Sequence, residues 1–82
     1  MQVYILYSEA LGRYYVGHTE DVFHRLAEHN SGEDYFTAPG APWELIATVP
    51  CSDRREAVQL EVAIKNRGTV CYLQDCGMLA VG

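Results

Sequence analysis

The sequence predicts an α+β fold, in which a small three-stranded antiparallel sheet is flanked by helices. Two runs of strand-forming residues, 3–7 and 13–17, are separated by a short turn-like segment, which is typical of a hairpin. Two later segments repeat apolar residues at helical spacing, and a third strand run lies between them. The predicted order is strand, strand, helix, strand, helix, helix.

The hairpin pattern fixes which side chains share a face. The first strand covers Val3 to Tyr7, and residues 8–12 form the turn. In the second strand, Tyr14 and Val16 point to one face, and Tyr15 and Gly17 to the other, because side chains alternate along a strand. Gly17 leaves its face bare, so we expect a backbone or a ligand to approach closely there.

The second strand runs directly into the first predicted helix. Thr19 is a suitable N-cap, and the two acidic residues after it suit the positive end of a helix dipole. The helix ends near residues 30–32, where Asn, Ser and Gly follow one another. Arg25 and His29 are four residues apart and lie at the edge of the apolar stripe, whereas the opposite side, with His24 and Glu28, faces water. The predicted stripe consists of Val22, Phe23, Leu26 and Ala27.

The remaining elements follow in order. Residues 33–42 contain two prolines and two acidic residues and predict an exposed loop. The third strand covers residues 43–49, with Trp43, Leu45, Ala47 and Val49 expected on one face, and Pro50 ends it. Asp53, followed three residues later by Glu56, predicts the start of the second helix, and Gly68 its end. Its predicted core face consists of Ala57, Leu60, Ala63, Ile64 and Arg67. A short helix through residue 75 and an apolar tail complete the chain.

Length and composition point to one domain that covers residues 1–82, since no linker or composition break divides the chain. No apolar run reaches the roughly 18 residues of a membrane span, and no signal-peptide pattern opens the chain. The three cysteines are an odd number without zinc-site spacing. We therefore expect reduced thiols in a cytoplasmic protein that does not contact a membrane.

The net charge of −5 limits the choice of partners. Nonspecific affinity for nucleic acid comes mainly from Lys and Arg on phosphates, and this chain has six such residues. Residues 33–42 and 69–82 contain no Lys or Arg. We expect binding to plain duplex to be weak and steeply salt-dependent.

Individually, the polar residues singled out above have ordinary structural explanations. Tyrosines are good strand residues, an arginine can cover a core with its stem, and a histidine near a helix end suits the dipole. Glu61 and Lys65 are spaced for an exposed ion pair. As an ordered set, however, they resemble the GIY-YIG nuclease family, most closely its small stand-alone branch. The matching landmarks are residues 4–8, 14–19, 25–26, 28–30, 42–43 and 61–65.

The resemblance implies metal-dependent hydrolysis of a phosphodiester in nucleic acid, with DNA as the first expectation. Carried onto this chain, Glu61 would hold one Mg²⁺ or Mn²⁺ ion, a hard cation that prefers carboxylate oxygen and water. Arg25 would stabilise the charge that develops on the scissile phosphate. Tyr4 would help to deprotonate the attacking water, while Tyr15 and His29 would position the water and the phosphate.

Two classes of function remain open at this point. The first is a small endonuclease or related phosphodiesterase, and we expect its sequence specificity to depend on a partner protein or on a homo-oligomer, because the sequence carries no added DNA-binding domain. The second is a nuclease-derived module that binds nucleic acid or protein with little catalysis. The nuclease hypothesis expects Tyr4, Tyr15, Arg25, His29 and Glu61 to line one concave surface at the side of the sheet. A location of Arg25 and Glu61 on opposite faces of the molecule would end this hypothesis.

Overall fold

The computed structural model describes residues 1–77, so the predicted apolar tail at 78–82 lies outside the described residues. It confirms the predicted α+β fold and its element order. Among residues 1–77, no helix is long and apolar enough to cross a membrane. The elements are β1 (Gln2–Ser8), β2 (Arg13–Thr19), α1 (Val22–Ser31), the short 3-10 helix η1 (Ala38–Gly40), β3 (Trp43–Pro50), α2 (Arg54–Arg67) and α3 (Thr69–Asp75).

The sheet has the order β2-β1-β3, and both pairs of strands are antiparallel. Tyr4 pairs with Gly17, and Leu6 pairs with Tyr15. Directly opposed residues point to the same face, so Tyr4, Tyr15 and Gly17 share one face, as the sequence predicts. β1 is central and β2 forms an edge of the sheet.

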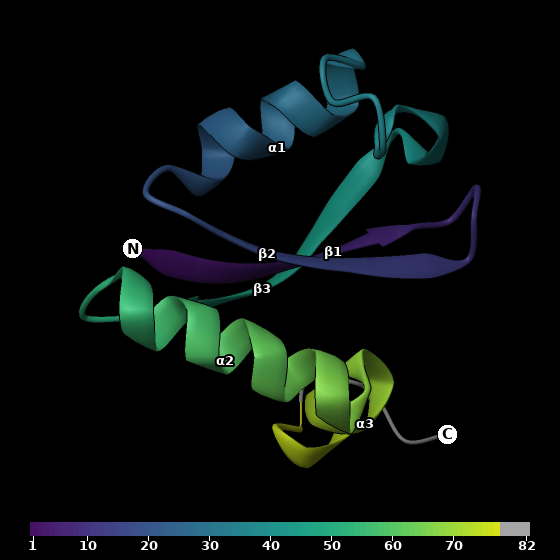
Figure 1. Cartoon of the computed structure of the whole chain (residues 1–82). Helices are drawn as coiled ribbons and strands as arrows, with labels where there is room; N and C mark the ends of the chain where they lie inside the picture. Colours follow the sequence, from purple (N-terminus) through teal and green to yellow (C-terminus); the bar gives the residue numbers. More distant parts are fainter. Residues whose placement is uncertain (78–82) are drawn as a thin grey trace.

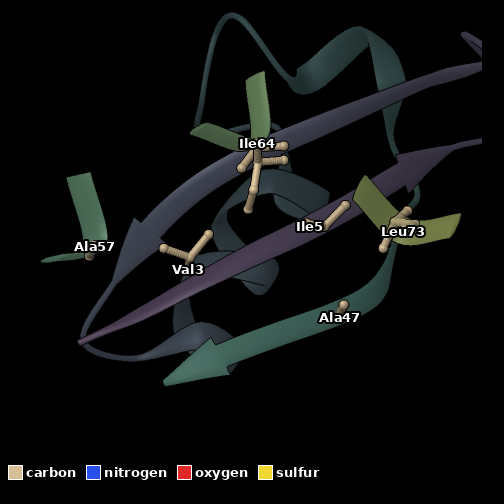
Figure 2. Packing of buried hydrophobic residues seen from close by; sticks show 7 residues of the cluster. Val3, Ile5, Ala47, Ala57, Ile64 and Leu73 are labelled. Atoms are coloured by element: carbon tan, nitrogen blue, oxygen red, sulfur yellow. The ribbon is translucent and has the colours of Figure 1, made fainter. Parts of the chain in front are cut away.

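The helices cover both faces of the sheet (Figure 1). Helix α1 lies on the face that carries Tyr4, and α2 with α3 lies on the other face. The two faces hold two separate clusters of buried side chains. Figure 2 shows the cluster between the sheet and α2–α3, which includes Val3, Ile5, Val16, Ala47, Ala57, Ile64 and Leu73. The α1-side cluster consists of Tyr4, Leu6, Val22 and Trp43.

Strand β3 does not keep one apolar face, contrary to the prediction from its sequence. Ile5 pairs with Ala47 and Leu6 pairs with Leu45, so the register shifts by one residue at Ile46. A β-bulge of this kind reverses the alternation of side chains beyond it. Trp43 and Leu45 consequently pack on the α1 side, whereas Ala47 packs on the α2 side.

Helix α1 differs from its prediction in its N-cap and in its buried side. Asp21, and not Thr19, is the N-cap, because its carboxylate accepts a hydrogen bond from the His24 amide at 3.0 Å. The buried residues are Val22 and His29, whereas Phe23 is 78% exposed. Ala27 is also exposed, so the buried side of the helix is turned by about one residue from the predicted apolar stripe. The predicted end is confirmed, since Gly32 follows the helix with a φ of 83°.

Helix α2 begins and ends as predicted. Asp53 accepts a hydrogen bond from the Glu56 amide at 2.8 Å, and Gly68 follows the helix with a φ of 93°. Ala57 and Ile64 are buried. Ala63 and Arg67 are exposed, contrary to the predicted core face.

Residues 33–42 are not simply an exposed loop. Thr37 is 2% exposed and Gly40 is buried, although Tyr35 and Phe36 point to solvent. The indole nitrogen of Trp43 donates to the Thr37 carbonyl at 2.7 Å. Ser8 donates to the Gly40 carbonyl at 2.7 Å. These hydrogen bonds hold the segment against the sheet and beside the C-terminal half of α1.

Candidate active site

Tyr4 occupies the face of the sheet that Gly17 leaves free. A Cβ atom at position 17 would lie 2.7 Å from the Tyr4 hydroxyl oxygen and 2.9 Å from Cζ, which is closer than real Cβ contacts. The hydroxyl therefore lies over the edge strand β2, in space that any larger residue would fill. We expected a backbone or a ligand to approach Gly17 closely, whereas the structure places the side chain of Tyr4 there.

A chain of hydrogen bonds runs inward from the Tyr4 hydroxyl. The hydroxyl oxygen is 3.1 Å from Nε2 of His29, and Nδ1 of His29 is 2.6 Å from the hydroxyl of Thr37. His29 has no exposed surface, so it lies at the centre of the buried side of α1 and not at its edge. Any effect of His29 on a bound substrate must therefore pass through a neighbouring side chain.

Tyr15 forms the wall beside this chain. Its ring centroid lies 4.9 Å from that of His29 and 6.1 Å from that of Tyr4. Its edge-to-face contact with Trp43, at 6.1 Å, continues the aromatic layer toward β3. Such contacts restrict the orientation of the His29 ring.

Arg25 lies beside the same cluster and is held by two carboxylates. One guanidinium nitrogen donates to Asp34 Oδ2 at 2.7 Å, and the other is 3.6 Å from Glu28. Asp34 also accepts a hydrogen bond from the Phe36 amide at 3.0 Å. Asp34 thereby connects α1 to the segment that carries Tyr35 and Phe36.

The surroundings perturb the ionisation of this cluster. Burial raises the pKa of Tyr4 to about 12, and the neighbouring Tyr15 acts in the same direction, whereas the charge of Arg25 opposes the rise. Burial lowers the pKa of His29 below its ordinary value, and the charge of Arg25 adds to this effect. Tyr4 and His29 are consequently both neutral near pH 7.

Glu61 projects from α2, on the other side of the sheet. One carboxylate oxygen is 2.9 Å from Nδ1 of His18, and the other is 2.9 Å from Nζ of Lys65. Burial alone would raise the pKa of Glu61, but the hydrogen bonds from His18 and Lys65 outweigh it, so the pKa lies below its ordinary value. Glu61 is therefore ionised near pH 7.

The structure thus brings together four of the five predicted residues and leaves Glu61 apart from them. Tyr4, Tyr15, Arg25 and His29 belong to the α1 side, and Glu61 to a helix on the opposite side of the sheet. Arg25 and Glu61 therefore lie on opposite faces of the sheet, and the structure does not show the single concave surface predicted for all five residues. The two groups are connected through neighbouring residues of the edge strand. Gly17 underlies the Tyr4 hydroxyl, and His18, the next residue, binds Glu61. A substrate that contacts both groups would have to lie across the β2 edge.

The donor set around Glu61 fits a weakly ligated hard cation. Within residues 1–77, no group of three His, Cys, Asp or Glu side chains could hold a metal ion unaided. Mg²⁺ retains several waters and is commonly held by one or two carboxylates together with substrate phosphates. A single ionised carboxylate such as Glu61 satisfies that requirement, provided that the substrate supplies further oxygens.

Three residues of the site carried no strong signal in the sequence. Thr37 and Asp34 lie in a segment that was expected to be exposed, and their partners follow only from the fold. His18 is part of the strand motif, but its contact with Glu61 spans 43 residues. No pattern in the sequence indicated that Asp34 pairs with Arg25, which lies nine residues earlier on the helix.

Comparisons with known proteins identify the family of this chain. A family model described as the GIY-YIG catalytic domain matches residues 1–69. A UPF0213 protein from Streptococcus pneumoniae is 37% identical over 57 residues, which cover 68% of this chain and 58% of that relative's length. The solution NMR structure of a UPF0213 protein from Bacillus halodurans superposes with a TM-score of 0.57 at 31% identity. It covers 94% of this chain and 82% of that chain.

Proposed function

Because the chain belongs to the GIY-YIG family of nuclease catalytic domains, whose members generally use divalent metals, we propose that it hydrolyses phosphodiester bonds in nucleic acid, with DNA as the first candidate. In this proposal Tyr4, Tyr15, Arg25, His29 and Glu61 form the catalytic set. The observation that carries it is the chain of hydrogen bonds from Tyr4 through His29 to Thr37, beside Arg25. A buried tyrosine hydroxyl needs one hydrogen-bond partner for stability alone, so what supports the proposal is that the chain continues through His29 to Thr37 and lies beside Arg25.

The buried imidazole is positioned to receive the proton of Tyr4, and the Asp34 carboxylate favours this transfer against the effect of burial and of Arg25, both of which lower the pKa of His29. Asp34 Oδ2 lies 3.8 Å from Nδ1 of His29 and favours a proton on that nitrogen. Nε2 then accepts a hydrogen bond from the Tyr4 hydroxyl, and Nδ1 donates to Thr37. Since the pKa of Tyr4 is about 12, free phenolate is scarce near pH 7, and a neighbouring acceptor is required for Tyr4 to act as a base.

In the proposed hydrolytic step, water is the nucleophile and His29 is the final proton acceptor. The oxygen of a water molecule attacks phosphorus, and the bond from phosphorus to the leaving sugar oxygen breaks. The attacking water gives a proton to the Tyr4 oxygen as the Tyr4 proton moves to Nε2 of His29. Asp34 faces the imidazolium so formed, and the leaving oxygen takes a proton from solvent.

Arg25 would supply the fixed positive charge for the pentacovalent phosphate. A planar guanidinium matches phosphate oxygens in two directions and stays charged at all relevant pH values. Its present partners are Asp34 and Glu28, so a phosphate must share or displace these carboxylates. The phosphate carries more negative charge in the transition state than in the singly charged ground state. It therefore competes more effectively with these carboxylates for Arg25 in the transition state.

Glu61 would hold the divalent cation, whose chemistry when bound is to polarise the phosphate and to favour ionisation of water. The carboxylate is already ionised and is oriented by His18. Lys65 must release one carboxylate oxygen or remain on the outer side when a cation binds. Mg²⁺ is the first candidate, and Mn²⁺ is the second.

Contacts other than Lys and Arg are needed to hold nucleic acid on this acidic chain. Tyr35 is 86% exposed and Phe36 is 89% exposed, and their rings form an edge-to-face pair 5.9 Å apart. Exposed aromatic side chains can stack with unpaired bases. Asp34 joins this pair to Arg25, so stacked bases would lie near the proposed catalytic set. A partner protein or a second copy could supply further contacts.

A nuclease-derived binding module with little catalysis is the second candidate. Two observations favour it, because both charged residues of the proposed catalytic set already interact within the protein. Arg25 pairs with two carboxylates, and each oxygen of Glu61 accepts a hydrogen bond. The two candidates differ in turnover. The binding module requires association with nucleic acid or protein without metal-dependent cleavage.

The direct test is incubation with labelled branched, nicked and single-stranded DNA and with RNA, in Mg²⁺, Mn²⁺ or EDTA. The proposal expects at least one of these substrates to be cut in the presence of metal, and not in EDTA or by Glu61→Ala. Equal cleavage by the wild type and Glu61→Ala would indicate a contaminant or different chemistry. Binding without cleavage under all conditions would favour the second candidate.

A further inference from the structure

A polar hollow of about 290 Å³ lies on the Glu61 side of the edge strand and is not used by the proposed chemistry. Its walls are Met1, His18, Thr19, Glu20 and Arg54. His18 belongs both to this hollow and to the Glu61 contact, so the two places are adjacent. The hollow therefore opens beside the proposed metal-binding carboxylate.

Arg54, in the wall of the hollow, forms no ion pair with a carboxylate of the described residues. Within residues 1–77, the ion pairs engage Arg25, Lys65 and Arg67, but not Arg54. Arg54 is the first residue of α2 and is exposed. Arg13 and Arg55 are likewise absent from these ion pairs, but neither lines the hollow, so Arg54 is the guanidinium that this hollow presents to an anion.

Helix geometry places Arg54 in line with Glu61. Residues seven apart are separated by about two turns, or about 10.5 Å, and lie on nearly the same side of a helix. Lys65 follows one turn after Glu61 on that side. The carboxylate is thus flanked along α2 by a cation on either side, an arrangement that suits the phosphates of one strand passing over a metal site.

We propose that the hollow binds a phosphodiester of the substrate strand, held by the guanidinium of Arg54 and the hydroxyl of Thr19, next to the bond that is cut. This inference rests on the proposed function and identifies how the substrate backbone is fixed relative to Glu61. The Thr19 hydroxyl accepts a hydrogen bond from the Asp21 amide at 3.2 Å and donates to the Asp21 carbonyl over a long contact of 3.4 Å, so its proton can be redirected to a phosphate oxygen. Glu20 also lines the hollow, and its negative charge weakens the binding of any anion there.

The test compares Arg54→Gln with Arg55→Gln, its exposed sequence neighbour that does not line the hollow. The probe is a fluorescein-labelled partial duplex DNA with a single-stranded overhang, titrated in EDTA from 50 to 200 mM salt. Loss of one phosphate contact should reduce the magnitude of the slope of log affinity against log salt by about 0.7–0.9. Between about 50 and 200 mM salt, the affinity of the variant should therefore fall about three-fold less than that of the wild type. Arg55→Gln should keep the wild-type slope, and Glu20→Gln should bind more tightly.

Equal slopes for the wild type and Arg54→Gln, equal losses in the two arginine variants, or no binding by the wild type would overturn the inference. Thermal melting of each variant excludes unfolding as the cause. Binding through Arg54 without cleavage in Mg²⁺ or Mn²⁺ would support the hollow and refute the hydrolase. Metal-dependent cleavage with an unchanged Arg54→Gln slope would support the hydrolase and refute the hollow.

Discussion

Replacement of Tyr4 by phenylalanine tests the central hydrogen-bonded chain with a change of one atom. Tyr4 is 2% exposed and its ring would remain in place, so packing is nearly preserved. The hydroxyl contact with Nε2 of His29, at 3.1 Å, would be lost. His29 has no exposed surface through which water could replace that partner.

The expected loss of stability follows from this burial. A buried polar atom left without a partner costs about 1–3 kcal/mol. For a domain of this size, each 1 kcal/mol corresponds to a fall in Tm of about 4–8 °C. Cleavage should fall by about 10²–10⁴, because a general acid–base contribution of that size is removed.

The assay combines urea unfolding with cleavage measured well below the Tm of the variant. Tyr7→Phe is the matched control, because Tyr7 lies on the same strand with its side chain on the opposite face. Tyr7→Phe should change stability and cleavage little. The reasoning would be refuted if Tyr4→Phe had wild-type stability, or if it were destabilised and still cleaved at the wild-type rate.

Three further predictions follow from the site. Arg25→Ala should reduce cleavage by about 10²–10³-fold. It should also raise the pKa of Asp34, which NMR titration of the carboxylate would detect, and an unchanged pKa of Asp34 would contradict the pairing. Because the pKa of His29 is lower in the folded protein, its contribution to stability is complete above the unfolded pKa of about 6.5 and is lost as pH falls through the folded value. Unfolding followed between pH 4 and 8 should show this loss, and His29→Gln should reduce it. Affinity for plain duplex should be weak and should fall steeply with salt; tight binding that salt does not weaken would refute the expected surface.

Local patterns predicted much of the fold. The register that brings Tyr4, Tyr15 and Gly17 to one face follows from the alternation of a short hairpin. The Asp53 cap and the glycines after both longer helices also act over a few residues, so they were visible in the sequence. These features depend on neighbours along the chain.

Features that depend on distant partners could not be predicted. The bulge at Ile46 in β3 arises where the strand passes from one cluster to the other, and nothing in its alternating apolar residues indicates the shift. His29 is buried because Tyr4, Tyr15 and Thr37 surround it, which its helical position alone does not reveal. The expected buried positions Leu26 and Leu60 are only half-buried, whereas Leu73 is fully buried.

The position of Glu61 was likewise a matter of topology. The sequence placed it one turn before Lys65 on the second long helix, and the ion pair at 2.9 Å is present. Which face of the sheet that helix covers depends on the path of the chain after β3. The predicted set is therefore divided across the β2 edge, where Gly17 and His18 connect its two parts.

Metal-dependent cleavage by Glu61→Gln, measured together with its melting curve, tests the central claim most directly. Glutamine keeps the size of the side chain and removes its charge, and Glu61 is only half-buried, so stability should change by about 1 kcal/mol or less. We predict cleavage by the wild type in Mg²⁺ or Mn²⁺, none in EDTA, and a loss of at least about 10²-fold in the folded variant. Wild-type cleavage by a normally folded Glu61→Gln, or cleavage that EDTA does not abolish, would contradict the account.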